Sequence, residues 1–214
     1  AIPRARVERP AQAPCPDAMQ AMMALIGDAA APLAIIGGAG WNARARAHFQ
    51  VFAERLGLPV ATAFRRQDAI SPSSKVYAGN LGYGPNPKLV ERVKQADLIL
   101  AIGARLGEAT TDGYTVPSPT APDRRLVHVH PDADERAALW DDGAVVDFDA
   151  GAEAHREWEE WATAHPNGHR LDLGQAVQFM RDTLPADTII CNGAGNFAGW
   201  WHRYWRDEGF PTQL

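Results

Sequence analysis

The chain has little cysteine and no long apolar run, and both scarcities exclude whole classes of protein. Its two cysteines, Cys15 and Cys191, lie far apart, so they form neither a disulfide framework nor a CxxC metal-binding motif. A reduced, cytoplasmic setting is therefore expected. The longest apolar stretches, such as 32–36 and 98–102, have the length of a buried strand. They are too short to cross a bilayer as a helix, so no membrane partner is expected.

Blocks of like charge are also missing. The 214 residues carry a formal net charge of -5, and no run of basic residues suggests a tail that binds nucleic acid. Glycine (19) and proline (16) occur in ordinary amounts, which excludes collagen-like and low-complexity sequences. The length suits one large domain, or one domain plus part of another. We therefore expect a small-molecule partner and no nucleic-acid partner.

The ends of the sequence predict a piece of a longer chain. Residues 1–16 contain four prolines, which favours a linker that enters the first domain. The sequence begins without methionine and stops abruptly after Leu214. We therefore expect that the natural protein continues beyond the residues given.

Apolar segments alternate with helical patterns between residues 17 and 164. Continuous apolar strands separated by helices are typical of a parallel sheet that is covered on both faces. The sequence therefore predicts an α/β fold with a doubly wound parallel sheet, Rossmann-like and of the kind that binds FAD or NAD, over 17–164. Strands are expected at 33–37, 59–63, 97–103, 125–130 and 144–148, and helices at 17–26, 43–56, 87–95, 132–139 and 151–164.

A turn-rich linker at 165–171 precedes the truncated start of a second α/β domain at 172–214. A single βα unit cannot bury both faces of its strand, so we expect this part to be mobile or to pack against a second copy. Five of the seven tryptophans lie at 158–205, and we expect them to pack in a core or an interface. The expected elements are a helix at 173–184, a strand at 188–191, a glycine turn at 192–195 and a helix at 196–205.

The glycine turn after the first strand partly fits a nucleotide-binding fingerprint. Residues 38–43, Gly-Ala-Gly-Trp-Asn-Ala, follow a strand and open a helix, as the G-x-G-x-x-G/A pattern requires. The acid that would hold a ribose is missing at the end of the second strand, where Arg65 and Arg66 follow instead. NAD is therefore disfavoured, and a phosphorylated ribose, as in NADP, stays open. A tight turn needed only for helix packing explains the same residues equally well.

Other polar groups give weaker signals. His128 and His130 share one face of a strand, but no third metal ligand lies nearby in the sequence, so we interpret them as strand residues. Residues 141–143, Asp-Asp-Gly, with Asn167 superficially echo a magnesium–diphosphate motif. These acids precede a strand instead of following one, and we interpret them as solvated turn residues. The sequence predicts no metal site.

Two strand motifs follow each other in a recognisable order. Residues 95–106 read QADLILAIGARL, and residues 126–132 read LVHVHPD. This pair resembles the A-D-L-x-L-x-x-G-x-R and x-I-x-I-D strands in the central domain of thiamine-diphosphate-dependent enzymes of the acetolactate synthase type. Segments at 32–40, 58–62 and 78–84 fall in the same order, and residues 172–205 resemble the entry to the diphosphate-binding domain.

The resemblance implies a catalytic parent and a fragment that is not catalytic by itself. Such enzymes have a pyrimidine-binding domain with an activating glutamate, this central domain, and a third domain with a G-D-G…N magnesium motif. The parent would use thiamine diphosphate and magnesium to decarboxylate a small 2-keto acid and transfer the carbanion equivalent. It would be a homodimer or homotetramer. The first domain and the magnesium motif have no counterpart in this sequence, so we expect no catalytic residue here.

The resemblance also assigns binding residues. Gly195, Asn196 and Phe197 match the family's turn that contacts the diphosphate. Some members bind FAD in the central domain, and the matching positions in this chain include Gly38, Gly40, Gly103 and Arg105.

Departures from the family pattern argue against FAD. Histidines replace the acids usually found at 128 and 130, and Arg65 and Arg66 stand in a stretch that is usually small and apolar. We therefore expect a degenerate cleft with a structural, dimer-supporting role. The alternatives are a free-standing module that binds FAD or NADP, and an NADP-dependent oxidoreductase with Arg65 or Arg66 on the extra phosphate.

Overall fold

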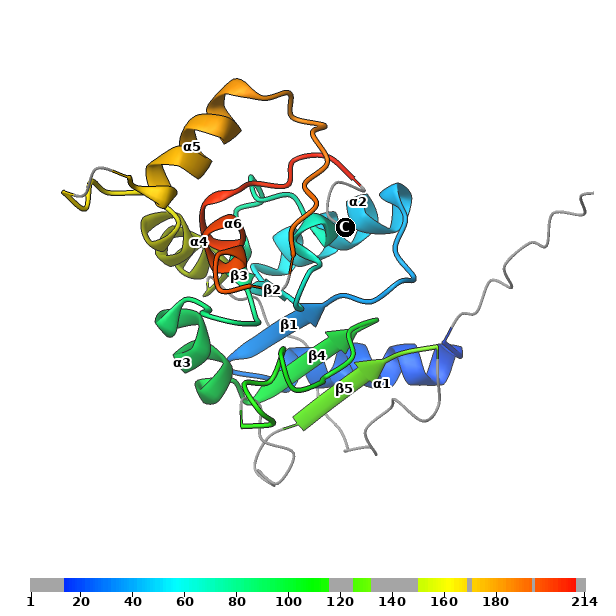
Figure 1. The fold of residues 1–214 in the computed structure, drawn as a ribbon. Helices are drawn as coiled ribbons and strands as arrows, with labels where there is room; N and C mark the ends of the chain where they lie inside the picture. Colours follow the sequence, from blue (N-terminus) through cyan, green and yellow to red (C-terminus); the bar gives the residue numbers. More distant parts are fainter. Residues whose placement is uncertain (1–13, 116–124, 132–149, 169–170, 194, 211–214) are drawn as a thin grey trace, which may run out of the picture.

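A five-stranded, all-parallel sheet forms the centre of the computed structural model, with the strand order β3-β2-β1-β4-β5 (Figure 1). The structure describes residues 14–115, 125–131, 150–168, 171–193 and 195–210. The predicted doubly wound α/β fold is confirmed. The strands are β1 (Pro32–Ile36), β2 (Val60–Thr62), β3 (Tyr77–Asn80), β4 (Leu98–Ile102) and β5 (Arg125–Val129).

Helices cover both faces of the sheet, which explains why β1 is apolar at every position. Leu33 and Ile35 face a cluster that includes α3, whereas Ala34 and Ile36 face one that includes α1 and α2. All five residues of β1 are buried. The described helices are α1 (Pro16–Asp28), α2 (Ala43–Leu56), α3 (Pro87–Gln95), α4 (Ala150–Trp161), α5 (Leu173–Thr183) and α6 (Ala198–Tyr204), with a 3₁₀ turn at Gln67–Ala69.

Local caps set where the helices begin and end. The Asn42 side chain accepts a hydrogen bond from the Ala45 amide, and Gly57 adopts a φ of 61° at the other end of α2. Asn86 and Asp172 cap α3 and α5 in the same way. Since each cap satisfies an amide that the helix itself leaves unpaired, the polar residue just before each apolar pattern fixes the start of the helix.

The edge of the sheet at β3 is closed by α4. The Trp158 ring is 2% exposed and stands edge-on to Tyr77 with 4.8 Å between the ring centroids. His155 Nδ1 donates to the Tyr77 carbonyl at 2.9 Å. Arg92 of α3 contacts Glu157 of α4 at 3.1 Å and so ties the two helices together. Helix α4 therefore belongs to the core of the sheet domain.

The structure differs from the predicted elements at several places. Strand β3 carries no apolar run, because its sequence is Tyr-Ala-Gly-Asn, and the pattern did not predict it. The predicted strand at 188–191 is wrong: only Ile190 makes a β-bridge there, since the unit offers no second strand of its own to pair with. The last helix covers Ala198–Tyr204 instead of 196–205. The predicted helix at 132–139 and strand at 144–148 lie outside the described residues.

The second unit packs against the sheet domain of the same chain, whereas the sequence predicts a part that is mobile or packs against a second copy. Arg203 of α6 donates to the Trp161 carbonyl at 2.8 Å, and its guanidinium lies 4.6 Å from the centre of the Trp161 ring. A small cluster of Val177, Tyr204 and Trp205 joins α5 to α6. No helix in the described part of the chain is long and apolar enough to span a membrane.

Replacing the tryptophan beneath β3 should destabilise the whole domain. We expect Trp158→Ala to lower the free energy of unfolding by about 3–5 kcal/mol, because the change leaves a large cavity between α4 and Tyr77. Trp200→Ala is the control, since this ring is 36% exposed, and it should cost within about 1 kcal/mol. Urea denaturation of both variants measures the difference, and equal losses would contradict the packing described.

Candidate functional site

The carboxyl ends of β1 and β4 lie at the point where the strand order of the sheet reverses. After β1 the chain adds β2 and β3 on one side, and it then crosses to place β4 and β5 on the other. Ligands of doubly wound sheets bind in the crevice at such a point. Gly38 follows β1 and Gly103 follows β4, so the structure brings these two predicted residues together at that crevice.

The two glycines meet backbone to backbone. Gly38 has a φ of 76°, and a Cβ atom there would lie 1.9 Å from the carbonyl oxygen of Gly103. Gly103 has a φ of 68°, and its Cβ would lie 2.6 Å from the carbonyl oxygen of Gly37. No other residue type fits this approach without moving one of the loops. Gly40 has nothing within 4 Å of its Cβ position, and Arg105 is exposed.

Two side chains of the protein donate hydrogen bonds to carbonyls of the loop after β1. Trp41 Nε1 donates to the Gly37 carbonyl at 2.7 Å, and the Arg66 guanidinium donates to the Gly38 carbonyl. Arg66 also contacts Asp68, whose side chain is 2% exposed, at 3.1 Å. The carbonyls of Gly37 and Gly38 are thus hydrogen-bonded to side chains of the chain itself.

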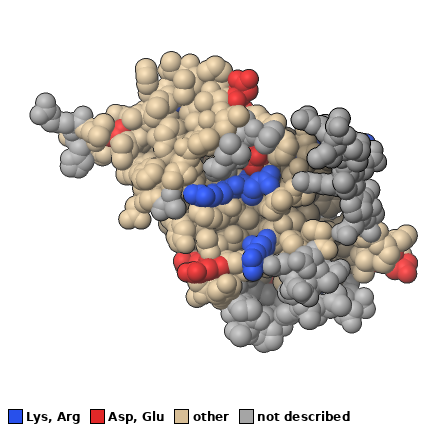
Figure 2. Space-filling view, turned by 45° about the vertical axis from the view of Figure 1, so that its right-hand side comes forward, with Lys and Arg blue, Asp and Glu red and all other residues tan. Residues whose placement is uncertain are grey.

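Basic side chains surround the same end of the sheet. Arg65 and Arg66 follow β2, and Arg105 follows β4. On the face drawn in Figure 2, Lys and Arg side chains lie near the middle, with Asp and Glu side chains close to them. Arg65 has a φ of 58°, and its Nη2 donates to the Asn192 carbonyl at 3.5 Å. This contact links the crevice to the second unit.

The two histidines at the end of β5 lie side by side, with 5.6 Å between their ring centroids. His128 Nε2 donates to the Ala104 carbonyl at 2.8 Å, so a backbone contact accounts for this ring nitrogen. Within the residues that the structure describes, no three His, Cys, Asp or Glu side chains lie close enough to hold a metal ion.

The turn at Gly195, Asn196 and Phe197 immediately precedes α6. The carbonyls of Gly195 and Asn196 accept from Ala198 and Gly199 at 2.9 and 3.2 Å, and all three residues of the turn are exposed. Helix α6 has only seven residues. Among the described residues, no three His, Cys, Asp or Glu side chains gather to hold a magnesium ion. The turn and α6 therefore do not form a complete thiamine diphosphate–magnesium site.

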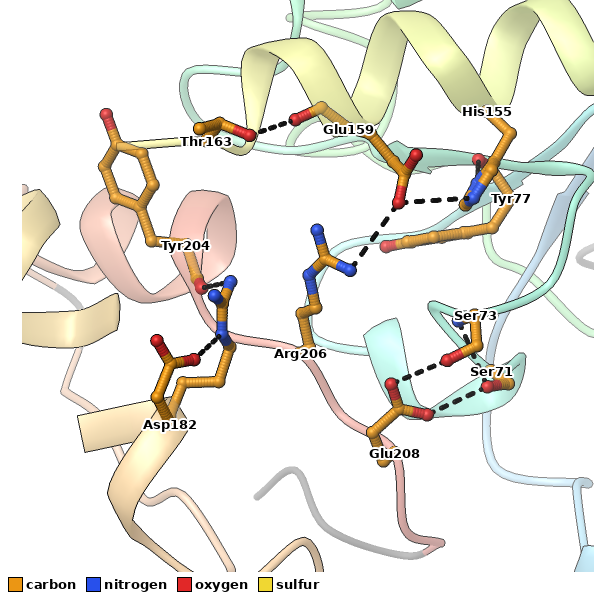
Figure 3. Close-up of polar contacts among 11 residues, drawn as sticks. Ser71, Ser73, Tyr77, His155, Glu159, Thr163, Asp182, Tyr204, Arg206 and Glu208 are labelled. Atoms are coloured by element: carbon orange, nitrogen blue, oxygen red, sulfur yellow. Dashed lines mark hydrogen bonds and ion pairs between the residues drawn. The ribbon is translucent and has the colours of Figure 1, made fainter. Parts of the chain in front are cut away.

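A contact that the sequence did not predict fastens residues 205–210, here called the terminal segment, to the sheet domain (Figure 3). Glu208 accepts hydrogen bonds from Ser73 at 2.8 Å and from Ser71 at 3.1 Å. Arg206 lies 3.7 Å from Glu159 and 5.0 Å from the centre of the Trp158 ring. These partners lie far apart in the sequence, and no local pattern marks them as partners.

Arg46 of α2 completes this attachment. Its guanidinium donates to the carbonyls of Asp207 and Glu208, with Nη2 at 3.4 Å from each oxygen. Burial lowers the pKa of Arg46, and the nearby carboxylates of Asp68, Glu208 and Asp207 oppose that effect. The terminal segment is therefore held by Arg46, by the hydroxyls of Ser71 and Ser73, and by its own Arg206.

The fold and the strand order define a doubly wound α/β domain with an all-parallel sheet. The chain belongs to the family described as "Thiamine pyrophosphate enzyme, central domain", whose model matches residues 19–146. The resemblance seen in the sequence is thereby confirmed. Thiamine pyrophosphate is another name for thiamine diphosphate.

Among the similar proteins are two kinds of enzyme. The chain is 36% identical over 89 residues to the sulfoacetaldehyde acetyltransferase of Alcaligenes xylosoxydans xylosoxydans, which covers 42% of the chain and 15% of the relative. It is 25% identical over 218 residues to the acetolactate synthase large subunit of Corynebacterium glutamicum, covering 90% of the chain and 34% of the relative. The chain thus spans about a third of the length of these relatives or less.

Alanine substitutions separate the two glycines of the first turn. We expect Gly38→Ala to lower the free energy of unfolding by about 1–3 kcal/mol or more, because it combines a left-handed backbone with a clash against Gly103. Gly40→Ala meets open space and should change stability by less than about 1 kcal/mol in either direction. Thermal unfolding of both variants checks this; a tolerated Gly38→Ala would refute the close approach of the two loops.

Proposed function

We propose that this chain is the central part of a thiamine-diphosphate-dependent 2-keto acid decarboxylase or carboligase resembling the acetolactate synthase large subunit, and that by itself it is structural and not catalytic. The family match over residues 19–146 supports the assignment to the parent enzyme. The similarity to an acetolactate synthase large subunit along 90% of the chain supports the same class.

The packing of Gly38 against Gly103 is the observation that carries the structural role. In a nucleotide site, the glycine turn leaves its backbone free to approach a pyrophosphate. Here the backbone of Gly38 faces Gly103, and the carbonyls of the loop accept from Trp41 and Arg66. The same residues thus act as a packing element, which favours a degenerate cleft over an FAD site.

Engaged arginines also count against an NADP site. Arg66 contacts Gly38 and Asp68, and Arg65 contacts Asn192. These contacts take up part of the donor capacity that an arginine would use to recognise a ribose phosphate. The oxidoreductase is therefore the less favoured alternative.

In the parent enzyme, thiamine diphosphate would supply the carbanion-stabilising chemistry, with magnesium on its diphosphate. We propose that Gly195, Asn196 and Phe197 keep their contact with the diphosphate, because they stand exposed ahead of α6. Since the described residues do not complete the site, no reaction step is assigned to this chain.

The proposed organisation follows the predicted boundaries. A linker at 1–16 leads into a central domain at 17–164, and a linker at 165–171 leads into the beginning of the diphosphate-binding domain. We propose a cytoplasmic parent that assembles as a homodimer or homotetramer and acts on a small 2-keto acid. Large apolar side chains exposed on the second unit support such an assembly, namely Leu171, Phe179, Ile189 and Phe197.

Calorimetric titration tests the structural role. We expect FAD, NADP and thiamine diphosphate with magnesium each to bind with a dissociation constant weaker than about 1 mM, and we expect no decarboxylation of pyruvate. Tight binding of NADP that is lost in Arg65→Ala and Arg66→Ala would overturn the proposal in favour of the oxidoreductase. Tight binding of FAD that is lost in Arg105→Ala would favour a nucleotide-binding module instead.

A further inference from the structure

His202 of α6 is buried at the junction between the two units. Its side chain lies against Phe64, which follows β2, with 5.7 Å between the ring centroids and an angle of 85° between the rings. The residue is 7% exposed, and neither ring nitrogen has a hydrogen-bond partner among the described residues. A neutral imidazole tolerates such a place better than a charged one, because burial penalises the charged form most.

The charges around this ring add to that preference. Arg65 comes from the same loop as Phe64, and its guanidinium lies 5.4 Å from the centre of the Phe64 ring. Burial lowers the pKa of His202, and the positive charge of Arg65 lowers it further. Other charged or titratable groups lie on α6 and on the segments around it. They include Tyr83, His155, Glu159, Asp172, Arg181, Asp182, Arg203, Tyr204, Arg206 and Asp207.

We propose that protonation of His202 weakens the docking of α6 and the terminal segment on the sheet domain, so that acidification releases this part of the chain. A second positive charge beside Arg65 would be buried, and neither nitrogen of the His202 ring has a hydrogen-bond partner among the described residues to offset it. Undocking returns the imidazolium to water and removes the repulsion. Release would also open the contact between Arg65 and Asn192 and those of Glu208 with Ser71 and Ser73.

The direction of the pH dependence follows from linkage. In the undocked chain His202 should titrate at its ordinary value of about 6.5, whereas the docked ring titrates lower. Docking is therefore at full strength above about pH 6.5, weakens as the pH falls through that value, and stops weakening below the docked pKa. One proton changes the docking equilibrium by at most about tenfold per pH unit.

His155 provides an internal contrast at the same junction. Its Nε2 lies 3.8 Å from a carboxylate oxygen of Glu159, and its Nδ1 donates to the Tyr77 carbonyl. Both nitrogens of this ring thus have polar neighbours, whereas those of His202 have no hydrogen-bond partner among the described residues and the nearby charge is that of Arg65. The release is therefore assigned to His202.

Hydrogen exchange of the native 214-residue chain tests the proposal. Protection of the amides at 198–204, corrected for the intrinsic rate, should fall between about pH 8 and about pH 5.5, by up to about tenfold per unit below about pH 6.5. Protection in β1 should stay constant over that range. His202→Phe keeps an aromatic ring on Phe64 without a titratable group, and it should abolish the fall. His48→Gln, at an exposed position of α2, should keep it.

An NMR titration of the His202 ring in the native chain gives a second readout that needs no variant. We expect a pKa below the ordinary histidine value, and Arg65→Gln should move it upward and reduce the loss of protection in α6. A ring that titrates at or above the ordinary value would overturn the proposal. So would constant protection of α6 in the native chain, or an equal fall in His202→Phe.

Discussion

The close approach of two loops at the carboxyl ends of β1 and β4 is the constraint on which the rest of the domain depends. Gly38 and Gly103 let the backbones touch where the chain leaves β1 and β4. Arg66 can then reach the Gly38 carbonyl while it pairs with Asp68. A glycine turn that resembles a nucleotide-binding motif thereby serves as a packing contact within the protein.

Arginine side chains make many of the other contacts that join separate elements of the chain. Arg92 joins α3 to α4, Arg203 and Arg206 join the second unit to α4, and Arg46 holds the terminal segment. A guanidinium suits this work because it donates in several directions and also stacks on aromatic rings such as Trp161. These arginines thus make contacts within the chain, which agrees with a scaffold more than with an anion receptor.

Much of the fold could be predicted from sequence, because buried parallel strands such as β1 and β4 are continuous apolar runs and Asn42 and Gly57 mark the ends of α2. The apolar pattern does not predict strand β3, because its own sequence is not an apolar run. Its burial depends on α4, which comes much later in the chain. The pairing of Gly38 with Gly103 and the position of His202 depend on contacts between distant segments. Sequence spacing shows which residues are available but not which ones meet.

The cover that α4 places over β3 has a consequence for the behaviour of the chain in solution. An exposed edge strand presents unpaired backbone groups that can template pairing with another molecule. Here Trp158 lies over Tyr77, and His155 takes up the carbonyl of Tyr77. This side of the sheet is therefore protected against intermolecular strand addition. Loosening α4 would expose the backbone groups of β3 to pairing with another molecule.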